Sequence, residues 1–121
     1  MRKLLAGVYK FKTEIFPERQ ELFTELSLAQ NPRILFITCS DSRIDPNLVT
    51  QAAPGDLFII RNAGNIVPPH ERHAGGTTAA IEYAVAALKV KHVVVCGHTD
   101  CGAIKGAMAP EDLGELPHTS D

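Results

Sequence analysis

Residues 34–43 of the chain read ILFITCSDSR, an apolar run rich in β-branched residues followed at once by a thiol, a carboxylate and a guanidinium. Residues 93–102 read VVVCGHTDCG and repeat this arrangement with an imidazole and further thiols. Such apolar runs are typical of buried strands in a parallel sheet. In an open α/β sheet, the loops that leave the carboxyl ends of the strands build the site. We therefore expect both polar segments at one edge of a sheet.

The pattern around these two segments predicts alternating strands and helices. We expect strands at 33–38, 57–61 and 92–96, and helices from Asp45-Pro46 to about Ala53, at about 77–88, and at 102–108. Asp45 suits a helix cap and Pro46 a first helical position. The helix at 77–88 carries one apolar stripe, made of Ala80, Ile81, Ala84, Val85 and Leu88. Residues 62–76 are rich in glycine and proline and predict a long loop.

The first 30 residues have a helical pattern of their own. Leu4, Val8, Phe11 and Ile15 follow helical spacing, and Pro17 is expected to end or kink that helix. A second helix is expected over 18–29, with Leu22, Phe23 and Leu26 on its inner face.

The sequence thus predicts a single α/β domain over 1–121, in which a parallel β-sheet core is flanked by helices. We expect a helical arm at 1–30, the α/β core at 31–108 and a polar tail at 109–121. Three strands make a thin sheet, so an apolar edge is expected to lie open.

Composition excludes several classes of function. The formal net charge is -2 and no stretch concentrates lysine and arginine, which argues against a nucleic-acid surface. No window approaches the roughly 20 apolar residues of a membrane span, and the apolar run at the start is too short for a signal peptide. Three cysteines are an odd number for a disulfide framework, so free or metal-bound thiols in a reducing cytoplasm are expected.

Cys39, His98 and Cys101 form a candidate metal-binding set. His98 and Cys101 can leave one tight turn, and Cys39 arrives from the neighbouring strand. Thiolate sulfur and imidazole nitrogen are ligands that Zn²⁺ prefers, and three protein ligands leave the fourth position open, as in catalytic zinc sites. The alternative is two buried cysteines and a histidine satisfied within the core.

Asp41 and Arg43 flank Ser42 and form a candidate carboxylate–guanidinium pair. The guanidinium would keep the carboxylate charged and fix its orientation. An ordinary loop salt bridge is the alternative. A phosphatase loop is disfavoured because it needs five residues between Cys and Arg, where this chain has three. A thioredoxin-like redox site is disfavoured because no Cys-x-x-Cys occurs.

The segments 39–43 (CSDSR) and 98–102 (HTDCG), taken together, resemble the β-class carbonic anhydrases. Further matches lie at 61–65 (RNAGN), at Gly75-Gly76 and at 81–84 (IEYA). The resemblance covers about 32–106, and the helical start resembles the family's dimerising arm. It implies zinc-dependent, reversible hydration of CO₂ to bicarbonate in a homodimer or larger homo-oligomer, located in the cytoplasm, with a microcompartment as one variant.

The resemblance also implies roles for individual residues. Cys39, His98 and Cys101 would bind Zn²⁺, and Asp41 with Arg43 would form a catalytic dyad beside the metal. The predicted substrate-binding residues are Gln30, Phe58, Ala63, Tyr83 and Gly102. Phe58, Ala63 and Tyr83 match positions that line an apolar CO₂ pocket, some of them reaching the site from the partner subunit. Gln30 matches an amide that hydrogen-bonds substrate oxygens.

The chain departs from the family in two ways. Phe36 and Thr38 stand where some members have the Trp and Gly of an inhibitory bicarbonate site, although Arg61 is retained; we therefore expect an open zinc position near neutral pH rather than one capped by Asp41. The chain also stops after the third strand and one helix, so a truncated form is expected. Two alternative functions remain: an inactive, zinc-stabilised oligomerising remnant, and a hydrolase of a CO₂ analogue such as CS₂ or COS.

Overall fold

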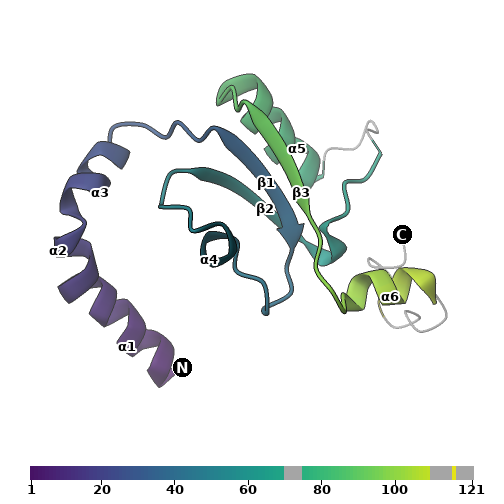
Figure 1. The fold of residues 1–121 in the computed structure, drawn as a ribbon, viewed down its shortest axis with the longest axis horizontal. Helices are drawn as coiled ribbons and strands as arrows, with labels where there is room; N and C mark the ends of the chain where they lie inside the picture. Colours follow the sequence, from purple (N-terminus) through teal and green to yellow (C-terminus); the bar gives the residue numbers. More distant parts are fainter. Residues whose placement is uncertain (70–74, 110–115, 117–121) are drawn as a thin grey trace. The chain divides into compact units, whose positions relative to one another are not determined.

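The computed structural model describes residues 1–69, 75–109 and 116 of the chain. Two compact units make up the chain, Met1–Gln30 and Asn31–Asp121, and each is described by itself (Figure 1). Most of the predicted polar tail and the predicted loop residues 70–74 lie outside the described residues.

The first unit is helical, as its sequence pattern predicts. It consists of α1 (Arg2–Lys10), a π-helical turn η1 (Phe11–Ile15), the short α2 (Phe16–Glu18) and α3 (Gln20–Leu26). The rings of Phe11, Phe16 and Phe23 pack together, with centroids 5.2 to 6.1 Å apart. This aromatic cluster explains why Phe23 lies on the inner face of its helix.

The sequence predicts that Pro17 ends or kinks the first helix, and the helical path ends two residues beyond it. Pro17 follows the π-helical turn η1, and Ile15 and Phe16 keep helical φ and ψ, so the chain continues through Pro17 without a break. The helical path breaks at Arg19, whose φ of -112° and ψ of 20° are not helical. The predicted second helix at 18–29 is also shorter in the structure, where α3 ends at Leu26.

The second unit contains a three-stranded, fully parallel sheet. Its strands are β1 (Ile34–Cys39), β2 (Leu57–Asn62) and β3 (His92–Cys96), in the order β2-β1-β3. β1 is therefore the central strand, and Figure 1 shows β2 and β3 on either side of it. The prediction of a parallel sheet with strands in these three places is confirmed, and the loops after β1 and β3 leave at the same edge.

Helices connect the strands as the sequence predicts. α4 (Pro46–Thr50) begins at the cap residue Asp45, whose carboxylate accepts hydrogen bonds from the N–H groups of Asn47 and Leu48. After β2, the predicted loop opens with a 3₁₀ turn, η2 (Ala63–Asn65). α5 (Gly76–Glu82) continues into the π-helical turn η3 (Tyr83–Ala87), and α6 (Gly102–Met108) follows β3.

The core lies between the sheet and the helix formed by α5 and η3. Its buried members are Leu35, Ile37, Ile60 and Ala84, and four half-buried residues pack against them: Phe58, Ala80, Ile81 and Val90. Of the predicted stripe on this helix, Ala84 is fully buried, whereas Val85 is exposed. The stripe is therefore narrower than the sequence pattern indicates.

β3 is exposed, although its apolar run predicts a buried strand. Val93 and Val95 are 55% and 58% exposed, whereas Leu35 and Ile37 in β1 are 0% and 2% exposed. The reason is packing: β2 and β3 both form edges of the sheet, but within the described residues the core cluster includes Phe58 and Ile60 of β2 and no residue of β3. The structure thus confirms the open apolar edge and corrects the burial of the strand that forms it.

None of the helices formed by the described residues has both the length and the apolar character that crossing a membrane requires.

Candidate metal centre

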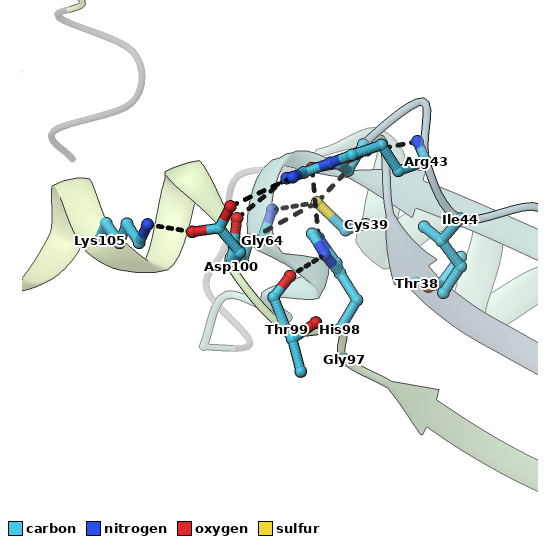
Figure 2. A network of polar contacts seen from close by, with 12 residues as sticks. Thr38, Cys39, Arg43, Ile44, Gly64, Gly97, His98, Thr99, Asp100 and Lys105 are labelled. Carbon is cyan, nitrogen blue, oxygen red and sulfur yellow. Dashed lines mark hydrogen bonds and ion pairs between the residues drawn. The ribbon is translucent and has the colours of Figure 1, made fainter.

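Cys39, His98 and Cys101 meet at the carboxyl edge of the sheet. Cys39 is the last residue of β1, and the loop after β3 supplies His98 and Cys101. Because β1 and β3 are parallel neighbours, both segments emerge at the same edge. One ligand atom from each of the three residues lies within 4.8 Å of the others, and both cysteines are buried. The sequence-predicted metal set is therefore brought together by the fold, and Figure 2 shows Cys39 beside His98.

The spacing of the two sulfur atoms fits a tetrahedral zinc ion. The Sγ atoms of Cys39 and Cys101 lie 3.8 Å apart. Two thiolates bound to one tetrahedral zinc at about 2.3 Å would also be separated by about 3.8 Å. A disulfide would instead need about 2 Å between these atoms, and all three cysteines of the chain are free.

The ring of His98 is oriented as a metal ligand would be. Its Nδ1 lies 2.9 Å from the carbonyl oxygen of Thr99. A carbonyl only accepts hydrogen bonds, so Nδ1 carries the proton and Nε2 keeps a free lone pair. Nε2 is buried and has no hydrogen-bond partner among the described residues. A buried lone pair directed at two thiols is the arrangement expected of a nitrogen ligand, and the donor set fits zinc.

Backbone N–H groups stabilise the thiolate form of Cys39. The N–H groups of Asp41 and Gly64 donate to its Sγ at 3.4 and 3.3 Å. Burial alone would raise the pKa of Cys39, but these N–H groups and the neighbouring His98 and Cys101 outweigh burial and lower it to about 7. This favours the deprotonated sulfur that a metal requires.

Gly64 can approach Cys39 because it has no side chain. Its φ is +79°, a conformation that residues with a Cβ rarely adopt. A Cβ at this position would lie 3.2 Å from the Cβ of Ala103 and 3.3 Å from the side chain of Ile66. Gly64, in the RNAGN segment, therefore stabilises the thiolate directly, through the hydrogen bond from its N–H to Sγ of Cys39.

Asp41 and Arg43 form a bidentate ion pair beside the three ligand atoms. The Nε and Nη2 atoms of Arg43 donate to the two carboxylate oxygens of Asp41 at 2.9 and 2.6 Å, and the backbone N–H of Arg43 adds a third bond at 2.9 Å. These bonds hold the pKa of Asp41 well below its usual range. Oδ2 of Asp41 also lies 3.7 Å from Nε2 of His98. The carboxylate is therefore charged, oriented and adjacent to the site.

Asp100 links the two loops that carry the ligands. Nη1 and Nη2 of Arg43 donate to the carboxylate and to the carbonyl oxygen of Asp100, at 3.2 and 3.0 Å. Lys105 of α6 pairs with the other carboxylate oxygen, and Figure 2 shows this chain of contacts. Lys105 first, and then Arg43, lower the pKa of Asp100.

A small cavity of about 180 Å³ opens at this place, lined by Arg43, Ile44, His98, Thr99 and Asp100. The predicted substrate-binding residues do not line it. Phe58 and Tyr83 contact each other through rings 6.0 Å apart, Ala63 begins η2 and Gly102 begins α6. Gln30 is an exposed residue at the end of the first unit. The roles of these five residues stay predictions.

Sequence reasoning missed the contributions of Gly64, Asp100 and Arg61. Each acts through backbone groups or through a link between loops, for which a sequence pattern carries no direct signal. The only available signal was that Gly64 and Arg61 fall within the matched segment RNAGN, and Asp100 within HTDCG.

Comparison with known proteins identifies the family. The family model described as carbonic anhydrase matches residues 34–120. A carbonic anhydrase of Synechococcus elongatus is 56% identical over 95% of this chain and 42% of its own length. A carbonic anhydrase of Pseudomonas aeruginosa is 50% identical over 97% of this chain and 53% of its own length. The chain thus spans about half the length of the curated relatives it matches.

Solved structures agree with the sequence matches. The β-carbonic anhydrase CcaA superposes with a TM-score of 0.96 at 52% identity, covering 100% of this chain and 59% of that one. A tetrameric β-carbonic anhydrase of Sordaria macrospora gives a TM-score of 0.78 at 42% identity, covering 88% of this chain and 53% of that one. The fold, the residues gathered at its edge and these matches show that the chain belongs to the β-class carbonic anhydrase family.

Proposed function

We propose that this chain binds one Zn²⁺ through Cys39, His98 and Cys101 and hydrates CO₂ reversibly to bicarbonate and a proton. The observation that carries the proposal is the 3.8 Å separation of the two sulfur atoms beside a buried imidazole nitrogen that has no hydrogen-bond partner in the described part of the chain. The relatives named carbonic anhydrase at 50 to 56% identity support the reaction.

Zinc in such a site lowers the pKa of water and so supplies a nucleophile near neutral pH. The residues around it provide orientation. His98 presents Nε2 to the metal because its Nδ1 proton is donated to the carbonyl of Thr99. Cys39 and Cys101 would supply negative charge to the ion from buried positions.

Asp41 has the role of a hydrogen-bond acceptor for the reacting water. Arg43 engages both of its oxygens, so the carboxylate cannot rotate freely and stays charged at neutral pH. A fixed acceptor beside the metal directs a lone pair of the reacting oxygen towards the substrate. The same engagement of Asp41 by Arg43 favours an open zinc position over one capped by Asp41, as proposed from the sequence.

The assembly is proposed to be a homo-oligomer. The structure from Sordaria macrospora is described as tetrameric, and this chain carries exposed apolar side chains on α1, among them Leu4, Leu5 and Val8.

The three free cysteines are compatible with a reducing compartment, and we propose the cytoplasm. No observation favours the CS₂ or COS hydrolase or the inactive remnant.

Stopped-flow measurement of CO₂ hydration tests the reaction. The zinc-loaded full chain is expected to exceed the buffer rate, and removal of zinc by a chelator should abolish the excess. Asp41→Asn is expected to reduce kcat at least about tenfold, whereas Asp56→Asn, in the turn before β2, serves as the matched control and should leave kcat unchanged. A chain that binds zinc but gives only the buffer rate would be the inactive remnant, and the proposed reaction would fail.

A further inference from the structure

Arg61 reaches from β2 across to the loop that follows β1. Its Nε donates to the carbonyl oxygen of Cys39 at 2.9 Å. Its Nη2 donates to two further carbonyls, those of Asp41 at 2.8 Å and Ile44 at 2.9 Å. One guanidinium therefore holds three carbonyl groups of a six-residue segment, 39–44, that carries a metal ligand and the Asp41–Arg43 pair.

These three bonds order a loop that has few backbone hydrogen bonds of its own. Within segment 39–44, the backbone contributes one turn bond, from the N–H of Ile44 to the carbonyl of Asp41 at 3.2 Å. The same carbonyl of Asp41, together with those of Cys39 and Ile44, accepts a hydrogen bond from Arg61. Bonds from a charged donor are stronger than neutral ones, and the planar guanidinium fixes the direction of each.

The register of the sheet explains why Arg61 can make these contacts. Thr38 in β1 lies opposite Arg61 in β2, and Cys39 lies opposite Asn62. The side chain of Arg61 therefore starts beside the end of β1 and extends over the loop as it leaves the sheet. A shorter donor at this position, or one without a fork, could not span the carbonyls of both Cys39 and Ile44.

We propose that Arg61 is a positioning residue for this centre: it orders segment 39–44 and thereby places the carboxylate of Asp41 relative to Cys39. It does not touch the ligand atoms. Its Nε and Nη2 atoms donate to backbone carbonyls of segment 39–44, so its guanidinium holds this loop in place. The effect on turnover rests on the proposed function, whereas the ordering of the loop does not.

The test compares Arg61→Met and Arg61→Lys with the wild-type full chain, loaded with zinc. Arg33→Lys is the matched control, since Arg33 lies directly before β1 and its guanidinium makes no hydrogen bond within the described residues. Amide hydrogen exchange reports loop order without requiring activity. The amides of Arg43 and Ile44 should exchange at least about tenfold faster in both Arg61 variants, while the amides of β1 keep their protection.

The second measurement is the turnover rate. In both Arg61 variants kcat should fall roughly 10- to 100-fold, with zinc content and KM close to wild type, because a small displacement of an orienting group costs rate rather than binding. Unchanged exchange at Arg43 and Ile44, or full recovery of both readings in Arg61→Lys, would overturn the inference. Loss of protection throughout β1 would also overturn it, since the role would then be one of global stability. A wild type that lacks activity would refute the proposed function, and the exchange data would still decide the role of Arg61.

Discussion

Cys39 illustrates how single residues prepare the site for a metal. Its thiol is buried, yet N–H groups from Asp41 and Gly64 and the adjacent His98 and Cys101 bring its pKa down to about 7. The neighbouring Cys39 in turn raises the pKa of His98. In the metal-free chain each of these two groups therefore favours the charged form of the other.

This arrangement predicts how zinc affinity depends on pH. A lowered pKa means that Cys39 remains a thiolate above about pH 7 and binds a proton as the pH falls through that value. Protonation of His98 also lowers the zinc affinity, since the protons on Cys39 and on Nε2 of His98 must both leave before zinc binds. Affinity should therefore fall at least about tenfold for each pH unit below 7.

Competition with a calibrated chelating dye between pH 8 and pH 5.5 measures this dependence. Cys96→Ser is the matched control, because Cys96 is a free cysteine outside the ligand group, and it should follow the wild-type curve. An affinity that stays constant over this range would contradict the assignment of Cys39 and His98 as ligands.

The sequence predicted which candidate ligand residues lie together better than it predicted their surroundings. Cys39, His98 and Cys101 follow apolar runs, and the rule for parallel strands is enough to bring such residues to one edge. Gly64 and Arg61 could not be assigned in the same way, because their partners are a sulfur atom and backbone carbonyls on another strand. Those contacts depend on register and loop conformation, which periodicity does not encode.

At the scale of elements, the contrast between β1 and β3 shows that burial depends on what packs against a strand and not on its composition alone. Both strands are apolar, but β1 is central and buried, whereas β3 forms an edge and exposes Val93 and Val95. Composition alone predicted two buried strands. The helical path at the start of the chain ends at Arg19, two residues after Pro17, and a π-helical turn directly precedes the helical turn that contains the proline.

This contrast predicts unequal effects of truncating side chains in the two strands. Leu35→Ala should lower the free energy of unfolding by about 2–5 kcal/mol, because it leaves a cavity in the core. Val95→Ala should cost no more than about 1 kcal/mol, mainly through the lower strand propensity of alanine. Urea unfolding of the two variants against wild type gives both values. Equal losses would show that β3 is covered in solution and would refute its exposure.

At the scale of the whole molecule, the chain consists of a helical unit and an α/β unit that carries the candidate metal centre. Sequence periodicity predicted the helices of the first unit and the strand and helix order of the second. It could not predict the π-helical turns η1 and η3, since a π turn needs only one altered hydrogen bond in an otherwise helical pattern.

The proposed homo-oligomer yields a prediction for α1. Leu4 and Val8 are exposed and lie one helical turn apart. If this face binds a second copy, the double variant Leu4→Glu, Val8→Glu should lower the mass measured by light scattering to that of the monomer, because two charges would enter an apolar contact. Lys10→Glu is the matched control, since it also changes the net charge by two, and it should keep the wild-type mass. An unchanged mass in the double variant would exclude α1 from the interface.

The central claim is that Cys39, His98 and Cys101 bind one zinc ion, and elemental analysis of the folded, desalted chain measures this most directly. The expected result is one zinc per chain, lost in Cys101→Ala and retained in Cys96→Ser. A folded wild-type chain without zinc, or a Cys101→Ala variant that keeps the full amount, would contradict the account.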